Sequence, residues 1–286
     1  MYAQLDLRPD GGEQLLYNHE DFPVRCVAGD LSSFLDYSAS CHWHNDFEIL
    51  MPTDGDLAYF VNGRIVPVKQ GQAIFINANR LHYGFSPTKT ECLYICLVFH
   101  PDIFMHPYLQ NQVKQISGDE SNDYFLLNDR QVLDSIRELY RLYNSSVKNT
   151  GILALSACAQ LLFRIGNQEQ QKQPTPLPDS AWISLRQMVG YLQTHYDQQI
   201  RLEDIAAAGA VCRSKCCKLF REKMNTTPTA YLNRYRLEKA KEHLLNQQDS
   251  ITEIAHKCGF YSPSYFSDQF RKLYGMSPRQ MQQSKK

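Results

Sequence analysis

The sequence predicts an α+β protein of two domains: an N-terminal antiparallel β-barrel with two helices, followed by an all-helical C-terminal domain. A length of 286 residues suggests about two domains. Up to about residue 100, short apolar runs alternate with turn residues, which is typical of a sandwich or a small barrel. From Ser180 onward, apolar residues recur at the spacing of helices instead.

Four short apolar runs and several turns mark the β-rich part of the chain. Asn62-Gly63 lies between two of these runs, and this dipeptide is a strong signal for a two-residue hairpin turn. Other turn residues, such as Gly55 and Gly71, separate the remaining runs. The predicted strands include residues 47–51, 58–61, 73–76 and 93–99.

Two helices follow the strands in the predicted N-terminal domain. Apolar residues recur at helical spacing in about 129–143 and again in about 152–164. A helix of this kind buries its apolar face, here either against the barrel or against a second subunit. These two helices are therefore the candidates for a homodimer interface.

A linker separates the two predicted domains at residues 166–180. This stretch is rich in glutamine and contains Pro174, Pro176 and Pro178, which favour a semi-extended spacer. The predicted domains are therefore 1–165 and 181–286.

The two parts of the chain carry opposite charge. Residues 1–180 hold 13 Lys and Arg against 21 Asp and Glu, a net charge of −8. Residues 181–286 hold 17 Lys and Arg against 9 Asp and Glu, a net charge of +8. Only the C-terminal part is therefore suited to a polyanion, although a solvated basic face would have the same composition.

No feature of the sequence predicts export or membrane insertion. The first ten residues lack the basic start and apolar run of a signal peptide, and no stretch approaches about 18 uninterrupted apolar residues. The nine cysteines are scattered without paired spacing, so we expect reduced thiols. These observations predict a cytoplasmic protein with no membrane partner.

The C-terminal part contains an internal repeat. Ile205 and Ile254 are 49 positions apart, whereas Phe220 and Phe270 are 50 apart, so the second copy has one additional residue. Each copy places Ile-Ala on a short helix, then a glycine, then a second helix with a buried aromatic residue. This is the layout of a helix-turn-helix, in which glycine is expected to permit the sharp turn. The motifs are predicted at about 202–223 and 251–273.

Local start signals support the second copy. Ser250 and Glu253 have the spacing of a capping box, and Ser262-Pro263 marks the start of a further helix. Two such helices can enter successive major-groove segments when about one helical turn, roughly 34 Å, separates them. A long helix of about 20 residues, opened by Thr227 and Pro228, would span roughly 30 Å of that distance.

The repeat resembles the AraC/XylS family of transcription regulators over about residues 182–281. The second copy carries the more diagnostic pattern: Ile-Ala, a Gly-Phe turn, Tyr-Phe in the recognition helix, Phe-Arg-Lys and then Gly-x-Ser-Pro. The resemblance implies that exposed residues early in each recognition helix contact bases. These positions are Ser214, Cys217 and Lys218 in the first module and Ser264, Ser267 and Asp268 in the second.

Basic residues beside these positions are better suited to phosphate groups, which position a protein without reading its sequence. They are Arg213, Lys215, Arg221, Arg271 and Lys272. Two departures from the family pattern stand out: Cys216 replaces a leucine that is usually buried, and Asp268 stands where arginine is frequent. Asp268 could accept a hydrogen bond from cytosine N4 or bond only a neighbouring side chain.

Two motifs in the β-rich part resemble those of cupins. The first consists of His42, His44, Glu48 and Gly55. In the second, asparagines replace the usual proline and inner glycine, and its residues are Gly71, Asn77, Asn79 and His82. The resemblance implies a small antiparallel barrel at roughly residues 20–100 that serves as a sensor.

The cupin-like residues have two interpretations. His42 and His44 alternate along a predicted strand and so point to one face, where Glu48 and His82 could join them around Zn, Fe, Mn or Ni. Alternatively, these side chains line a polar pocket or satisfy hydrogen bonds of the barrel. We favour the metal-free interpretation, because the resemblance implies that regulator cupins commonly keep the His-x-His pair without a demonstrated metal role.

The barrel is expected to bind a small effector, since aromatic faces with scattered polar groups suit a sugar or an aromatic ring. The expected polar pocket residues are His42, His44, Glu48, Tyr59 and His82. Further candidates are Trp43, Phe60, Phe75 and Tyr83, of which strand alternation turns only some inward.

Together, these features predict a ligand-responsive transcription regulator, and among regulators an activator that binds double-stranded DNA as a homodimer and contacts RNA polymerase. No catalytic residue and no cofactor are expected, apart from the metal alternative. A metal-dependent cupin enzyme fused to a basic domain would instead show bound metal and turnover. A non-specific nucleic-acid scaffold would show strong salt dependence and no preferred sequence.

Overall fold

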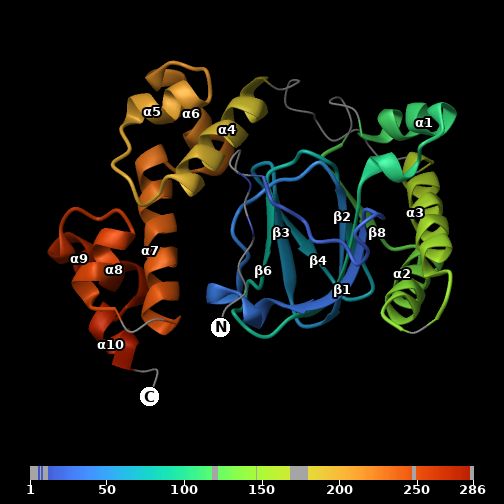
Figure 1. Ribbon diagram of the computed structural model, residues 1–286, viewed down its shortest axis with the longest axis horizontal. Coiled ribbons are helices and arrows are strands. Elements are labelled where there is room, and N and C mark those ends of the chain that lie inside the picture. Colours follow the sequence, from blue (N-terminus) through green and yellow to red (C-terminus); the bar gives the residue numbers. More distant parts are fainter. Residues whose placement is uncertain are drawn as a thin grey trace. The chain divides into compact units, whose positions relative to one another are not determined.

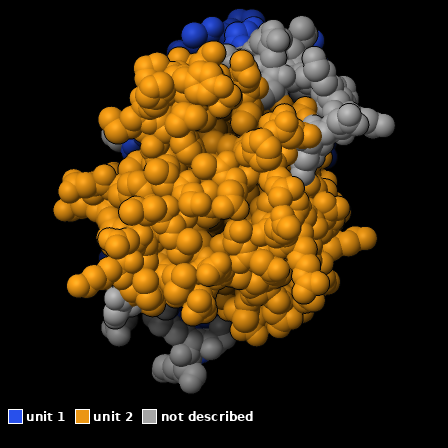
Figure 2. Space-filling model, turned by 90° about the vertical axis from the view of Figure 1, so that its right-hand side faces the viewer, with its two compact units in different colours: residues 1–3, 7–12, 180–286 blue, residues 4–6, 13–179 orange. Residues whose placement is uncertain are grey.

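The computed structural model describes residues 6, 8, 12–117, 122–145, 147–167, 180–246 and 249–283. Contacts divide the chain into two compact units, coloured separately in Figure 2. The β unit contains residues 13–179 and the helical unit contains residues 180–286. Most of the predicted linker, residues 168–179, lies outside the described residues.

Two antiparallel sheets form the β unit (Figure 1). The larger sheet has the strand order β1-β7-β2-β5-β8 and the smaller has the order β4-β3-β6. The strands are β1 (Val24–Asp30), β2 (Phe47–Asp54), β3 (Leu57–Val61), β4 (Arg64–Val68), β5 (Ala73–Ile76), β6 (His82–Phe85), β7 (Leu93–Phe99) and β8 (Tyr124–Leu127). The antiparallel β-fold predicted from the short apolar runs is confirmed.

Asn62 and Gly63 join β3 to β4 through the tight turn that these two residues predict. Both have positive φ, 44° and 86°, which is the pattern of the hairpin turn whose twist matches paired strands. The resulting register turns Tyr59 of β3 into the apolar layer between the two sheets.

Apolar side chains fill two layers of the β unit. One layer lies between the sheets and joins Tyr59 to residues such as Ile74 of the larger sheet. The other lies between the larger sheet and the helices α1 (Pro107–Ser117), α2 (Arg130–Tyr143) and α3 (Thr150–Gly166) (Figure 1). Because the larger sheet is covered on both faces, its central strand β2 is a nearly continuous apolar run.

The helices of the β unit differ in one respect from the prediction. Helices α2 and α3 correspond to the predicted segments, but α1 is a third helix that the sequence analysis missed. It buries only Val113, so its sequence carries little apolar periodicity. Strand β8, which pairs with β5, also lies in a region for which no strand was predicted.

Two helix pairs and a long connecting helix dominate the helical unit (Figure 1). Its helices in the described part of the chain are α4 (Ser180–Thr194), α5 (Leu202–Ala208), α6 (Arg213–Met224), α7 (Pro228–Asn246), α8 (Ile251–Lys257), α9 (Pro263–Tyr274) and α10 (Pro278–Gln283). The pairs α5–α6 and α8–α9 are the two helix-turn-helix modules, and both end within one residue of the predicted limits. None of the described helices has both the length and the apolar character needed to span a membrane.

Gly209, the glycine of the first module, does not have the role in the sharp turn that the sequence predicts. Gly209 has a φ of −89°, and the left-handed residue of the first turn is Ala210, with a φ of 51°. In the second turn, Gly259 takes this conformation with a φ of 76°. Packing explains Gly209 instead, because a Cβ there would lie 2.6 Å from Cγ of Met188. The second turn is one residue longer, as predicted, and its additional residue is the exposed Tyr261.

Arg236 of α7 ties the two modules together. Its Nε donates to the carbonyl of Tyr196 at 2.7 Å, and its Nη2 donates to the carbonyl of Gln198 at 2.6 Å. The guanidinium carbon lies 5.9 Å from the centre of the Phe260 ring in the second turn. One buried side chain therefore connects the segment that leads into α5 with the turn of the second module.

Candidate functional site

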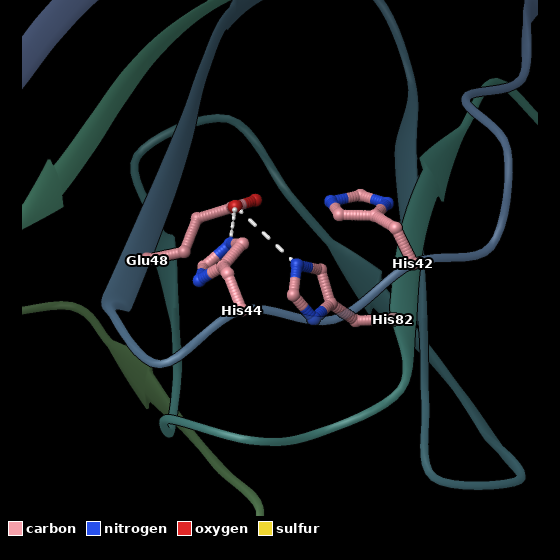
Figure 3. Close-up of side chains that lie close together, drawn as sticks. All are labelled: His42, His44, Glu48 and His82. Carbon is pink, nitrogen blue, oxygen red and sulfur yellow. Dashed lines mark hydrogen bonds and ion pairs between the residues drawn. The ribbon is translucent and has the colours of Figure 1, made fainter. Parts of the chain in front are cut away.

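Four side chains converge inside the β unit: His42, His44, Glu48 and His82 (Figure 3). Glu48 projects from β2 and His82 from the start of β6, while His42 pairs with His82 through an isolated backbone bridge. His44 lies in the loop before β2, so the strand predicted through both histidines is wrong. The bridge and the loop nevertheless direct both imidazoles to the same place.

The cluster is compact and buried. The nearest ligand atoms of its four residues all lie within 4.8 Å of one another. His44 Nε2 lies 3.0 Å from Glu48 Oε2, and His82 Nε2 lies 3.4 Å from the same oxygen (Figure 3). The rings of His42 and His82 are 4.3 Å apart between centroids. Two imidazole nitrogens therefore face one carboxylate oxygen, and the third imidazole lies beside them.

A backbone carbonyl holds the second nitrogen of each histidine. The three Nδ1–carbonyl distances are 2.8 Å for His42 and Ser40, 3.1 Å for His44 and Asp46, and 2.7 Å for His82 and Arg80. A carbonyl only accepts hydrogen bonds, so the network assigns the proton to each Nδ1. When neutral, each imidazole then presents a lone pair on Nε2, as metal-ligating histidines do.

The contacts within the cluster shift pKa values in opposite directions. Burial and the neighbouring His82 lower the pKa of His42 to about 3. Burial also lowers the pKa of His44, but the hydrogen bond to Glu48 and the nearby carboxylates outweigh it and place that pKa above its ordinary value. Burial opposes ionisation of Glu48, yet His82 and His44 hold its pKa well below the usual range. Without a metal, an ionised Glu48 therefore pairs with His44.

Tyr59 completes the set of polar residues predicted for the pocket. Its hydroxyl donates to Glu48 Oε1, so both oxygens of that carboxylate have partners. Phe75, a further candidate from the sequence, does not lie beside the cluster, because it packs between the larger sheet and the helices. Phe60 and Tyr83 stack on each other with centroids 5.0 Å apart, on the face of β3 opposite Tyr59.

Glu13, which precedes β1, was missed by the sequence analysis. Its backbone N–H donates to the carbonyl of Trp43 at 2.8 Å, and its Oε2 lies 3.4 Å from His42 Nε2. Burial raises the pKa of Glu13 to about 7. No motif marks a single glutamate far from the histidines in sequence, so only the three-dimensional arrangement reveals it.

The donor set fits a divalent transition metal, which is the alternative that the cupin-like motifs left open. Imidazole nitrogen and carboxylate oxygen are ligands shared by Zn, Fe, Mn and Ni. Second partners restrain the three imidazoles and Glu48, as in many metal sites. His82 Nε2 is buried without an aligned hydrogen-bond partner in the described part of the chain, and a bound cation would satisfy it.

The first recognition helix, α6, presents the predicted DNA-contacting residues on its open side. The exposed ones are Arg213, Ser214, Lys215, Lys218 and Arg221, and Cys217 is half-buried. Arg213 pairs with Glu203 at 2.7 Å, and Lys218 lies 3.8 Å from Glu222. No ion pair between described residues includes Lys215 or Arg221, so both charges are available to phosphates.

The second recognition helix, α9, offers fewer positive charges. Its exposed candidates are Ser264, Asp268, Arg271 and Lys272, and Ser267 is half-buried. The Ser267 hydroxyl donates to the carbonyl of Pro263 at 2.8 Å. Asp268 pairs with Lys272 at 2.8 Å. This contact is the second of the two roles considered for Asp268, a bond to a neighbouring side chain.

The buried sides of the two recognition helices agree with the core predicted from the repeat. Phe220 and Phe270 are fully buried, and so is Cys216, which takes the place of the leucine expected from the family pattern. These contacts determine which side of each helix stays open. Ser214 and Ser264, in the first turns of α6 and α9, both remain exposed.

Two family models match the chain. An AraC-like ligand binding domain matches residues 32–163, within the β unit, and a helix-turn-helix domain matches residues 205–284, within the helical unit. Each of the two units thus matches a family model of its own.

Relatives of known name align with nearly the whole chain. The uncharacterized HTH-type transcriptional regulator YdeC of Bacillus subtilis (strain 168) is 27% identical over 267 residues, which cover 90% of this chain and 91% of YdeC. The HTH-type transcriptional activator RhaS of Klebsiella pneumoniae (strain 342) is 27% identical over 279 residues, which cover 95% and 98% of the two chains.

Solved structures align with one or both units. The DNA-binding domain of AdpA in complex with a target DNA is 28% identical, with coverage of 35% of this chain and 91% of that domain and a TM-score of 0.34. ToxT from Vibrio cholerae O395 is 16% identical, with coverage of 91% and 97% and a TM-score of 0.46.

Proposed function

The chain belongs to the AraC family of DNA-binding transcription regulators and carries a ligand-binding domain, and from this membership we propose that it is an activator controlled by a small molecule. The observation that carries the proposal is a buried polar cluster between two apolar sheets, which suits an effector pocket. A sugar or a related metabolite is the effector class we propose. The name of the RhaS relative, an activator, supports activation. A contact with RNA polymerase is part of the same proposal.

The test of this proposal begins with selection of bound DNA from a random pool by the full chain. Transcription from a promoter that carries the selected site is then measured with purified RNA polymerase, with and without candidate metabolites. An increase that depends on one metabolite is the expected result. Repression, or activation that is indifferent to every metabolite that binds the protein, would contradict it.

Base reading is proposed for Ser214, Cys217 and Lys218 of α6 and for Ser264, Ser267 and Asp268 of α9. Lys218 is the most direct test, because a lysine can donate to the acceptors of guanine. Lys218→Ala should relax the preference at one base position of the selected site. A uniform loss of affinity for all sequences, with a weaker salt dependence, would assign Lys218 to a phosphate instead.

We propose further that the histidine cluster holds a divalent metal, which reverses the preference drawn from the motifs alone. The geometry supports this, because ligand atoms of the three imidazoles and of the Glu48 carboxylate lie within 4.8 Å of one another, while a backbone carbonyl holds each Nδ1. His42, His44, Glu48 and His82 would hold the ion, and a metal there would offer a Lewis-acidic position to an effector oxygen.

Metal analysis of protein purified without chelators tests this assignment. One equivalent of a transition metal is expected in the full chain and less than a tenth of that in His82→Gln. Cys212→Ser is the matched control, because Cys212 is the exposed cysteine of the chain and could bind metal by itself. Metal content that follows Cys212 rather than His82 would refute the assignment.

A homodimer through the outer face of α3 is also proposed. Ile152, Leu155 and Phe163 recur on one side of α3 and are exposed, although they are large and apolar. Figure 2 views the β unit from the side on which α1, α2 and α3 lie. Sedimentation should show a dimer that Phe163→Glu disrupts, while Ile65→Glu on strand β4 leaves it intact. A monomer at micromolar concentration, with and without DNA, would exclude this interface.

The relatives are transcription regulators rather than enzymes. We accordingly propose that the cluster binds its effector without turning it over. After prolonged incubation with metal-loaded protein, the effector should be recovered unchanged. Formation of more than one equivalent of product per protein would contradict this proposal.

A further inference from the structure

The second helix-turn-helix module carries an exposed aromatic residue that the first module lacks. Tyr261 is the additional residue of the turn between α8 and α9, and its side chain is 88% exposed. Within the described residues, no hydrogen bond or ring contact includes this side chain. In the first module, Val211 leads directly into the helix cap Cys212, so no residue corresponds to Tyr261.

The backbone on both sides of Tyr261 is fixed. Phe260, which precedes it, is buried, and its N–H donates to the carbonyl of Ala255 at 2.9 Å. Ser262, which follows it, caps α9, because its hydroxyl accepts from the N–H of Tyr265 at 3.3 Å. The turn therefore presents the Tyr261 ring from a fixed place, and a partner that covers the ring does not have to order the backbone first.

The place of Tyr261 is the end of the module that enters DNA. In a helix-turn-helix, the N-terminal residues of the recognition helix contact the base edges of the major groove. Tyr261 directly precedes this end of α9, where Ser264, Tyr265 and Asp268 form an exposed face. Its ring is therefore placed to meet the same base edges as that face.

The start of α9 is aromatic where the start of α6 is basic. Counted from the two helix caps, Tyr265 takes the place of Lys215. In the same way, Asp268 takes the place of Lys218. The Tyr265 hydroxyl accepts from Nδ2 of Asn233 at 3.3 Å, which holds this ring against α7. Such a surface offers little attraction for phosphates and is better suited to an apolar group of the DNA.

Thymine carries the apolar group that base edges offer in the major groove, its 5-methyl. A tyrosine ring supplies a large apolar area, and its burial against a methyl group removes both from water. We propose that Tyr261 reads the 5-methyl group of one thymine and so determines the base preference at that position. The inference rests on the base reading proposed for α9, to which it adds a residue outside the recognition helix and an apolar mode of recognition.

The test compares thymine with uracil, which lacks only the 5-methyl group. The full chain first selects a site from random DNA, and each thymine of that site is then replaced in turn by deoxyuridine. Affinity for every DNA is measured with the full chain, Tyr261→Ala and Tyr261→Phe. Tyr108→Ala, at an exposed tyrosine of α1, is the matched control, and circular dichroism checks that each variant folds.

One deoxyuridine replacement should weaken binding by the full chain about fourfold, which is the effect of one buried methyl group. Tyr261→Phe and Tyr108→Ala should show the same loss, because both keep the ring at position 261. Tyr261→Ala should not distinguish the two bases and should bind the thymine site about fourfold more weakly than the full chain. The slope of log affinity against log salt should be equal in all four proteins, because the contact involves no phosphate.

Three results would overturn the inference. The first is that Tyr261→Ala is as sensitive to deoxyuridine as the full chain, or that the full chain is insensitive to every replacement. The second is a loss in Tyr261→Phe as large as in Tyr261→Ala, which would assign the hydroxyl to a phosphate. The third is unchanged DNA affinity of Tyr261→Ala with a loss of transcription, which would assign the ring to RNA polymerase.

The base reading proposed for α9 fails on a different observation. It fails if the selected sequence stays the same when Ser264, Ser267 and Asp268 are all replaced by alanine. Selection with that triple variant therefore separates an error about Tyr261 from an error about the recognition helix.

Discussion

The turns of the first and second helix-turn-helix modules are closed by the same pair of backbone hydrogen bonds. In the first, Ala210 and Val211 donate to the carbonyls of Ala207 and Ala206; in the second, Gly259 and Phe260 donate to His256 and Ala255. Ala210 is thus the counterpart of Gly259, although the repeat in the sequence pairs Gly259 with Gly209. An alanine in the left-handed region is strained, and a glycine there is not.

The starts of the recognition helices also favour the second module. Ser262 accepts from the N–H of Tyr265 at the start of α9 and Pro263 follows it, whereas Cys212 at the start of α6 makes no side-chain cap. The charges favour the first module instead. Helix α6 carries five basic residues and one acidic residue, whereas α9 carries two basic residues and one acidic residue. The second module is therefore the better built by local rules, and the first is the better suited to a polyanion.

The largest expected effect comes from Gly259→Ala. A Cβ at this position would lie 2.3 Å from the carbonyl oxygen of Tyr196, and the left-handed φ would add strain. The close contact and the backbone strain together should lower the free energy of unfolding of the helical unit by about 4 kcal/mol. Urea unfolding followed by circular dichroism measures it.

Gly275→Ala provides the matched control, because Gly275 also has positive φ but a Cβ added there would have no atom within 4 Å. It should cost only the strain of the left-handed conformation, about 1 kcal/mol. Equal losses for the two substitutions would show that the contact with Tyr196 does not matter and that the two modules are not packed through this turn.

Removal of the arginine between the modules is expected to cost somewhat less. Arg236→Met leaves the carbonyls of Tyr196 and Gln198 without their donor, and hydrogen bonds from a charged group are worth about 1.5 to 3 kcal/mol each. A total loss of about 3 kcal/mol is expected after the methionine recovers some packing. Arg234→Met on the exposed side of α7 should change stability by less than about 0.5 kcal/mol. A loss for Arg236→Met no larger than this control would exclude the bridging role.

The difference between the modules also explains what the sequence predicts well. Where local rules agree, as in the capping box of Ser250 and Glu253 or the hairpin turn at Asn62-Gly63, the elements fall where they were expected. The buried positions of Phe220 and Phe270 follow from the same periodicity. Ala210 takes the left-handed conformation that local rules reserve for glycine. The sequence repeat therefore assigned this turn position to Gly209 instead.

The candidate pocket was only partly predictable for a related physical reason. His42, His44, Glu48 and His82 belong to two motifs that the cupin resemblance brings together, so their convergence could be anticipated without the correct strand. Glu13 depends on a contact between distant segments, which no local pattern encodes. The second partners of the histidines are backbone carbonyls, which have no signature in the sequence.

The charge difference between the recognition helices predicts unequal contributions to DNA affinity. The double substitution Lys215→Ala and Arg221→Ala removes two unpaired charges from α6 and should weaken binding by about 1 to 2 kcal/mol. The slope of log affinity against log salt should fall in magnitude by about 2. Arg271→Ala, the equivalent of Arg221 in α9, should lower it by about 1. A larger effect of Arg271 than of the α6 pair would reverse the assignment of the first module as the electrostatic one.

The smallest effect tests the strain in the first module directly. Ala210 is exposed, so Ala210→Gly removes no packing and relieves the left-handed strain. The greater freedom of glycine in the unfolded chain offsets part of this gain, and a net stabilisation of about 0.5 kcal/mol is expected. Ala207→Gly, an exposed position inside α5 with ordinary helical geometry, should instead destabilise by about 1 kcal/mol. If both substitutions destabilise the protein equally, Ala210 is not strained, and the two modules differ in sequence but not in the quality of their turns.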